Sequence, residues 1–246
     1  MCPGSNSTKC GPSLKKNSEN EEDEFGKQWI WVSYAPQFRL ILGTVVGPRT
    51  YDSALQLITI TAAIIVGIPM FFSDGFSCYL QALIECYHQI KTFPKTGKRG
   101  RPRNPVKEPH PELVYGQIVK EKEGGRLVRI SKRVKCGAER LAKSGLSIGT
   151  SLLERLNLTF RQSLAPLGRK TLSYSKDRKR MRQQVVFFQV FYNFARPHMG
   201  LREQVCDNPN IFETKWLPRT PAMAAGITGH VWTFRELLVM KLPPES

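Results

Sequence analysis

A carboxylate, an amide and a guanidinium follow one another along a segment with helical periodicity between Ser151 and Arg161. Glu154, Asn157 and Arg161 stand three, four and seven residues apart, and these spacings place side chains on one face of an α-helix. A second, apolar face is formed by Leu152, Leu153, Leu156 and Phe160. A carboxylate can hold a divalent metal ion, and an arginine one or two turns away can bind a phosphate. The pattern therefore permits phosphoryl chemistry, although a surface helix with ordinary ion pairs is its commoner origin.

A further carboxylate, Asp74, directly follows an apolar run that is typical of a buried strand. A carboxylate at the carboxyl end of a strand lies where α/β sheets often carry their sites. An Asp-Gly pair is also an ordinary turn. By itself, Asp74 would be a turn residue more often than a ligand.

The charge of the chain narrows the choice of partner. Its 246 residues include 37 Lys and Arg against 20 Asp and Glu, which gives a formal charge of +17. Hydrophobic residues make up 41%, enough for a folded core. An excess of positive charge of this size favours a polyanion as the binding partner: nucleic acid first, and an anionic membrane surface second. Basic structural proteins share the signal, so charge alone does not predict an enzyme.

Cysteine usage and apolar runs predict a cytoplasmic protein. None of the six cysteines forms a C-x-x-C pair, and their scatter suits reduced thiols. Residues 1–16 lack the apolar stretch of a signal peptide. The run 53–73 has no charged residue and is long enough to span a bilayer. Because Gly67 and Pro69 interrupt it, a buried helix over 53–65 followed by a strand over 68–73 explains it better.

Periodicity along the rest of the chain predicts an α/β fold with a mixed sheet flanked by helices. Residues 1–28 read as a mobile polar tail, residues 29–202 as the core, and residues 203–246 as a C-terminal helical tail. The core begins with a hairpin over 29–34 and 39–46. Further helices are expected over 76–90, 151–161 and 176–194, and a short one over 233–238.

A basic insert is predicted within the core over residues 91–135. Its first part, 91–111, is broken by Gly and Pro and carries Lys98, Arg99, Arg101 and Arg103. This loop is either a solvated linker or a flexible arm that follows a phosphate backbone. Its second part alternates apolar and polar residues over 113–119 and 126–134, as a hairpin turning at Gly124-Gly125 does.

Four passages together resemble a known family. They are Phe71-Phe72-Ser73-Asp74-Gly75-Phe76, the segment Ser151 to Arg161, Arg169-Lys170-Thr171-Leu172-Ser173-Tyr174-Ser175-Lys176, and Tyr192-Asn193-Phe194-Ala195-Arg196-Pro197-His198. In order and spacing they resemble prokaryotic insertion-sequence transposases. The closest type is the insertion-sequence-one family of the DDE superfamily. The resemblance runs from about Lys15 to the C-terminus.

The resemblance implies a ribonuclease H-like core in which three acidic residues hold two divalent metal ions, Mg²⁺ or Mn²⁺. Asp74 would be the second acid and Glu154 the third. Water would first free a 3′ hydroxyl, which would then attack target DNA. Partners would be the element ends, target DNA and further copies of the chain. The residues expected to bind DNA are Asn157, Arg161, Arg169, Lys170, Lys98, Arg99, Arg101 and Arg103. For Asn157 and Arg161, pairing on the helix surface stays an equal alternative.

The first acid of the family is not found where it is expected. Residues 8–14 contain no carboxylate and no strand pattern, and residues 1–7 leave no room for the family's N-terminal DNA-binding region. Asp23 could substitute, but it lies in a polar run. The sequence therefore predicts a truncated and inactive transposase with an exposed sheet edge. The alternative is a nonenzymatic basic DNA-binding protein derived from one.

Overall fold

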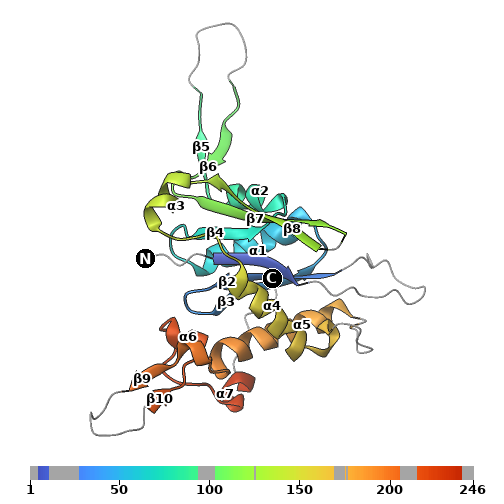
Figure 1. Cartoon of the computed structure of the whole chain (residues 1–246), viewed down its shortest axis with the longest axis vertical. Helices are drawn as coiled ribbons and strands as arrows, with labels where there is room; N and C mark the ends of the chain where they lie inside the picture. Colours follow the sequence, from blue (N-terminus) through green and yellow to red (C-terminus); the bar gives the residue numbers. More distant parts are fainter. Residues whose placement is uncertain are drawn as a thin grey trace, which may run out of the picture.

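A mixed six-stranded sheet forms the centre of the molecule in a computed structural model, which describes residues 5–10, 28–93, 103–124, 126–168, 175, 177–205 and 215–239. Its strands are β1 (Ser5–Cys10), β2 (Trp29–Ala35), β3 (Leu40–Gly47), β4 (Met70–Asp74), β7 (Val114–Glu123) and β8 (Arg126–Cys136). Their order is β3-β2-β1-β4-β7-β8 (Figure 1). β1 runs parallel to β4, and β4 runs parallel to β7, while the β1–β2, β2–β3 and β7–β8 pairs are antiparallel.

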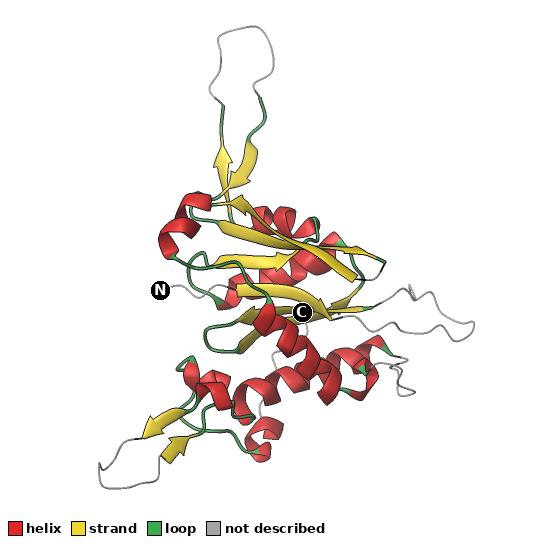
Figure 2. Ribbon diagram, in the orientation of Figure 1, coloured by secondary structure: helices red, strands yellow, loops and turns green. Residues whose placement is uncertain are grey.

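Helices cover both faces of this sheet (Figure 2). One face carries α1 (Tyr51–Ile64) and α2 (Cys78–Cys86), and the other carries α3 (Ala138–Ser144), α4 (Ser151–Ser163) and α5 (Arg178–Val190). The mixed α/β architecture is the one that the sequence predicted. The predicted hairpin over 29–46 and the helices in α1, α4 and α5 are confirmed, with ends shifted by a few residues.

Alternation along the strands divides the core into two layers, because successive side chains of a strand point to opposite faces. Trp31 and Phe71 pack against α1 and α2. Ile30 and Val32, the sequence neighbours of Trp31, pack instead against α4 and α5. Phe72 packs with residues of α3 and the segment that follows it. Burying apolar side chains on both faces fixes the register of each strand, since a shift by one residue would exchange the two faces.

The first strand is present, and this corrects the prediction of a mobile tail for residues 5–10. The sequence Ser-Asn-Ser-Thr-Lys-Cys has no apolar alternation, which is why its pattern did not predict a strand. Its backbone pairs on both sides: Ser7 aligns with Ser33 of β2 and with Ser73 of β4. A strand between two others satisfies backbone N–H and C=O groups whatever its side chains are. The expected exposed edge at this position is therefore also wrong, and the edges of the sheet are β3 and β8.

The segment 91–135, predicted as a basic insert, is divided between two parts of the structure. β7 (Val114–Glu123) and β8 (Arg126–Cys136) belong to the main sheet and pair antiparallel, which confirms the hairpin predicted over 113–119 and 126–134. The hairpin that projects from the molecule is β5 (His88–Lys91) paired with β6 (Val106–Pro109), at the top of Figure 1. The helix predicted over 76–90 ends at Cys86, where the His88 ring meets the Glu85 carbonyl oxygen at 3.0 Å.

The C-terminal residues pack onto the end of α5. A π-helical turn, η2 (Phe191–Ala195), continues α5, and two short 3₁₀ turns are η1 (Ala165–Leu167) and η3 (Met199–Leu201). Beyond them lie β9 (Glu203–Val205), β10 (Lys215–Leu217), α6 (Pro221–Ala224) and α7 (Phe234–Val239). The Trp232 N–H donates to the Phe194 carbonyl oxygen at 3.0 Å, and the two rings lie 4.4 Å apart. The short helix predicted over 233–238 is confirmed as α7.

The uncharged run 53–73 forms α1 and β4, as the sequence predicted. Across the described residues, no helix combines the length and the apolar character needed to cross a bilayer.

Candidate functional site

Asp74 is the last residue of β4, where it aligns with Ile118 of β7. Its Oδ1 accepts a hydrogen bond from the Phe76 N–H at 3.3 Å. Burial raises the pKa of the Asp74 carboxyl, since desolvation disfavours its charged form. That hydrogen bond and the charge of Arg49 act in the opposite direction. The Arg49 guanidinium itself lies over the Phe76 ring, 4.9 Å from its centre. Asp74 is thus both a turn acceptor and a desolvated carboxyl.

Glu154 lies in the first turn of α4 and is held by two neighbours. The Thr150 hydroxyl donates to Glu154 Oε1 at 3.0 Å, and the Lys120 ammonium forms an ion pair with the same oxygen. The hydrogen bond from Lys120 is the main cause that lowers the pKa of Glu154. Because the Glu154 side chain is 51% exposed, this pair contributes little to stability, about 0–1 kcal/mol.

Lys120, the partner of Glu154, lies on the strand that pairs with the one ending at Asp74. It lies on β7 two residues beyond Ile118, the partner of Asp74, and so points to the same face as Ile118. Glu154 reaches that face from α4. Within the described ranges, however, no hydrogen bond or ion pair joins the Asp74 and Glu154 carboxylates. What lies beside Glu154 is an ammonium group.

The described residues do not fit a two-metal centre. They contain no cluster of three or more His, Cys, Asp or Glu side chains that could hold a metal ion. The strand β4, which ends at Asp74, lies between β1 and β7, and none of the residues of β1 is acidic. The Lys120 ammonium would also repel a divalent cation at Glu154. Asp23, the possible substitute, lies outside the described residues.

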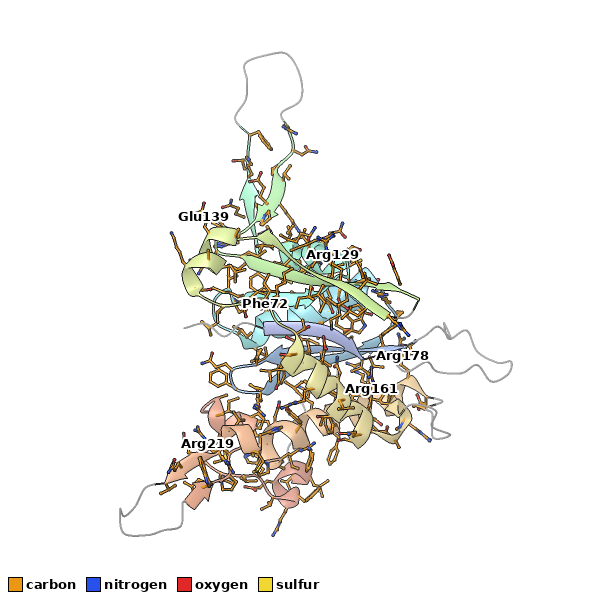
Figure 3. All side chains as sticks on the ribbon, in the orientation of Figure 1. Phe72, Arg129, Glu139, Arg161, Arg178 and Arg219 are labelled. Atoms are coloured by element: carbon orange, nitrogen blue, oxygen red, sulfur yellow. The ribbon has the colours of Figure 1, made fainter. Side chains whose placement is uncertain are left out.

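The residues predicted to bind DNA are found in different environments. Asn157 is buried in α4 and only 8% exposed, which leaves little of its surface for a contact to DNA. Arg161 is half-buried on the same helix (Figure 3). Arg103 is exposed, and its guanidinium lies 4.8 Å from the centre of the Phe93 ring. Lys98, Arg99, Arg101, Arg169 and Lys170 lie outside the described residues.

Exposed cations gather instead on two elements that the prediction did not single out as a site. The edge strand β8 carries Arg126, Arg129, Lys132, Arg133 and Lys135. The first turns of α5 carry Arg178, Lys179, Arg180 and Arg182. Arg129 and Arg178 are labelled in Figure 3. The basic run at the start of α5 is visible in the sequence, whereas the position of β8 at the sheet edge is not.

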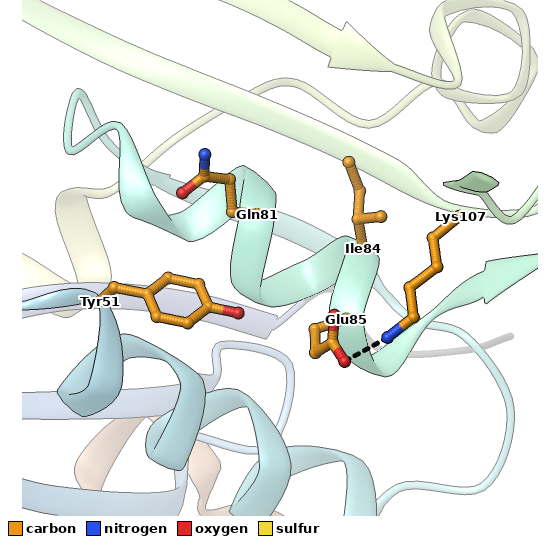
Figure 4. A pocket seen from close by; sticks show the side chains of 5 residues that line it. All are labelled: Tyr51, Gln81, Ile84, Glu85 and Lys107. Atoms are coloured by element: carbon orange, nitrogen blue, oxygen red, sulfur yellow. Dashed lines mark hydrogen bonds and ion pairs between the residues drawn. The ribbon is translucent and has the colours of Figure 1, made fainter. Parts of the chain in front are cut away.

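Among the described residues, a cavity of about 810 Å³ lies between β4 and the segment after α3, with Met70 and Phe72 in its wall. Two smaller cavities also flank the sheet. One, of about 290 Å³, lies where the β5–β6 hairpin meets α2, and the ion pair between Lys107 and Glu85 lies beside it (Figure 4). Because Lys107 and Glu85 neutralise each other's charge, this cavity has, among the described residues that line it, no free charged group that could bind a ligand or catalyse a reaction. The other, of about 280 Å³, lies beside α4 and is lined by Arg39, Arg155, Arg196 and His198 among others. None of these four was predicted as a site residue, although Arg196 and His198 belong to the Tyr-Asn-x-x-Arg-Pro-His passage.

In comparisons with known proteins, no family model, curated protein or solved structure matches this chain.

Proposed function

We propose that this chain is an insertion-sequence transposase in origin and that it binds DNA without cutting it. The observation that carries the proposal is the environment of Glu154. Glu154 lies on a helix that packs on a mixed sheet, beside β7, and β7 pairs with the strand that ends at Asp74. This arrangement supports a DDE-type scaffold. The partner of Glu154, however, is the Lys120 ammonium rather than a set of carboxylates. A mixed sheet with helices on both faces also supports the ribonuclease H-like fold that the resemblance implies.

Loss of strand transfer follows from the chemistry of the two remaining acids. Two-metal catalysis needs carboxylates that together clamp the attacking and leaving oxygens. The β1 strand contributes none, and the described residues bring no third acid to Asp74 and Glu154. We therefore propose that neither Mg²⁺ nor Mn²⁺ supports DNA cleavage by this chain.

DNA binding follows from charge. The chain carries +17, and exposed cations line β8 and the start of α5. Lys and Arg that contact phosphates release condensed counterions, so the affinity falls as salt rises. Sequence-independent binding of this kind requires no intact metal centre.

The test compares the chain with Glu154→Gln in two assays. Nicking and strand transfer are followed with Mg²⁺ or Mn²⁺ on supercoiled DNA, and binding is followed by fluorescence anisotropy of a labelled duplex over a range of salt. We expect no metal-dependent activity in either protein and a steep loss of binding with salt in both. Metal-dependent cleavage that Glu154→Gln abolishes would overturn the proposal, because it would show a complete site. Salt-insensitive binding, or none, would overturn the DNA partner.

A second variant links binding to the basic edge strand. The double change Arg129→Gln and Arg133→Gln removes two exposed charges from β8. If both contact phosphates, the slope of log K against log salt should fall by roughly 1.8, since each contact contributes about 0.9. The matched control is Arg235→Gln, an exposed arginine on α7 at the far end of the molecule. An equal change of slope in the control would exclude β8 as the interface.

A further inference from the structure

The cavity beside α4 is built by four separate parts of the chain. Tyr34 comes from β2, Arg39 from the turn between β2 and β3, Arg155 from α4, and Arg196 and His198 from the segment after η2. Its volume is about 280 Å³, room for roughly nine water molecules at about 30 Å³ each. The cavity is therefore large enough for a small anion together with part of an attached group.

Positive charge without compensation is the main property of this cavity. Three arginines line it, and of the described residues that form its wall none is acidic. Among the ion pairs of the described residues, none involves Arg39, Arg155 or Arg196. The one neighbouring carboxylate along α4 is Glu154, which pairs with Lys120. Guanidinium groups gathered in this way repel one another unless an anion lies between them.

The position of Arg39 is held in an unfavourable backbone conformation. Arg39 has φ = 52°, and among the described residues it is the one non-glycine residue with a positive φ. This conformation is costly for a residue with a Cβ. The Arg39 guanidinium packs against the backbone of Gly200, where any added Cβ would collide with it. The fold thus holds this side chain in one place at the cavity wall.

His198, a residue of the cavity wall, has a buried ring nitrogen without a partner in the part of the chain that the structure describes. His198 Nε2 is inaccessible to solvent and has no hydrogen-bond partner among the described residues. Burial, followed by the charges of Arg196 and Arg39, lowers the pKa of His198 to about 4, so its ring is neutral at pH 7. The ring lies edge-on to Tyr192, with 4.5 Å between the ring centres. An unpaired buried nitrogen is costly, and the neutral ring with its proton on Nε2 would gain a hydrogen-bond acceptor if an anion reached it.

We propose that this cavity binds a phosphate group, with the guanidinium groups of Arg39, Arg155 and Arg196 as its ligands and the His198 ring as a further donor. Guanidinium groups match the geometry of phosphate oxygens and remain charged at all working pH values. The phosphate can be free, or it can be the terminal phosphate of a nucleic-acid strand. The proposal does not rest on the DNA-binding function, because inorganic phosphate alone is a sufficient probe.

The experiment titrates the full chain with inorganic phosphate by calorimetry, at constant ionic strength set with chloride. We expect saturable binding with one site. Arg196→Gln and Arg155→Gln should each weaken it about tenfold or more, since each removes a charge-assisted hydrogen bond. Arg155 is exposed, so its variant should fold even if Arg196→Gln does not. The matched control Arg235→Gln removes the same charge from α7 and should bind phosphate like the original chain.

A spectroscopic arm reports the contact at His198. The ring carbon signals of His198 are followed by NMR over pH, with and without saturating phosphate. We expect phosphate to raise the pKa of His198, because an anion stabilises the imidazolium form. Absence of saturable binding, equal weakening in Arg235→Gln, or an unchanged His198 titration at saturation would each overturn the proposal.

A third arm separates the two sources of the phosphate. A short oligothymidylate with a 5′ phosphate is compared with the same strand lacking it. Tighter binding of the phosphorylated strand, lost in Arg155→Gln, supports a strand terminus as the ligand. Equal binding of both strands, together with binding of inorganic phosphate, supports the free anion. Duplex binding that persists while phosphate binding fails would overturn only this cavity and leave the proposed function intact.

Discussion

Asn193 protects the open edge of the sheet, and its removal should destabilise the chain. β3 is an edge strand, and the backbone of Ile41 in β3 is directed away from its partner strand. Asn193 Oδ1 accepts a hydrogen bond from the Ile41 N–H at 3.0 Å, and its Nδ2 donates to the Ile41 carbonyl oxygen at 2.8 Å. The amide therefore bonds to both backbone groups of Ile41, as a neighbouring strand would.

The expected cost of Asn193→Ala follows from these two bonds. Ile41 is 1% exposed and Asn193 is 5% exposed, so water cannot replace the lost partner without rearrangement. A buried donor or acceptor left unpaired costs about 1–3 kcal/mol. The Ile41 carbonyl oxygen retains a long contact of 3.5 Å from Gln189, so leaving it without Asn193 costs less than leaving the Ile41 N–H unpaired. We expect a loss of about 2–4 kcal/mol in the free energy of unfolding.

Urea denaturation followed by tryptophan fluorescence measures this loss, and Gln189→Ala is the matched control. Gln189 also reaches the β3 edge and is half-buried: it accepts a hydrogen bond from the Thr44 hydroxyl at 2.8 Å, while its contacts to the Ile41 and Leu42 carbonyl oxygens are long, at 3.5 and 3.4 Å. Its removal should therefore cost about 1 kcal/mol, since it deletes one short side-chain hydrogen bond and the long ones are weak. The reasoning is refuted if Asn193→Ala costs less than about 0.5 kcal/mol, or if Gln189→Ala costs more than Asn193→Ala.

Three further predictions concern pH, the ion pair and packing. The folded pKa of His198, about 4 against 6.5, means that its contribution to stability is complete above pH 6.5 and is lost as the pH falls towards 4. In phosphate-free buffer, His198→Gln should remove up to roughly 3 kcal/mol of this dependence, as measured by denaturation at several pH values. Lys120→Met should change stability by less than about 1 kcal/mol, yet raise the pKa of Glu154 in an NMR titration, since the Lys120 bond lowers it. Gly116→Ala should cost about 1–3 kcal/mol in thermal denaturation, because its Cβ would lie 2.8 Å from Ile148 Cδ1; an unchanged melting temperature would contradict this.

Several elements could be predicted because their signals are local. The hairpin of β2 and β3, the helix α1 and the helix that carries Glu154 follow from runs of apolar residues with period two or 3.6. Asp74 was correctly expected at the end of a strand. Asn157 was expected to share a helix face with Glu154, and both residues do lie on α4, three positions apart. The tertiary packing nevertheless buries Asn157 and leaves Glu154 exposed, because the sheet touches the helix along a wider stripe than spacing alone defines.

The amino-acid sequence by itself determined the net charge, the mixed α/β class and the positions of Asp74 and Glu154 along the chain. Only the tertiary structure decided that the polar segment Ser5–Cys10 enters the sheet, because strand pairing satisfies backbone groups and does not require an apolar pattern. It also decided that Lys120 lies beside Glu154, 34 residues away in sequence. Contacts of this kind depend on how strands and helices are placed in space, and no local spacing of residues encodes them.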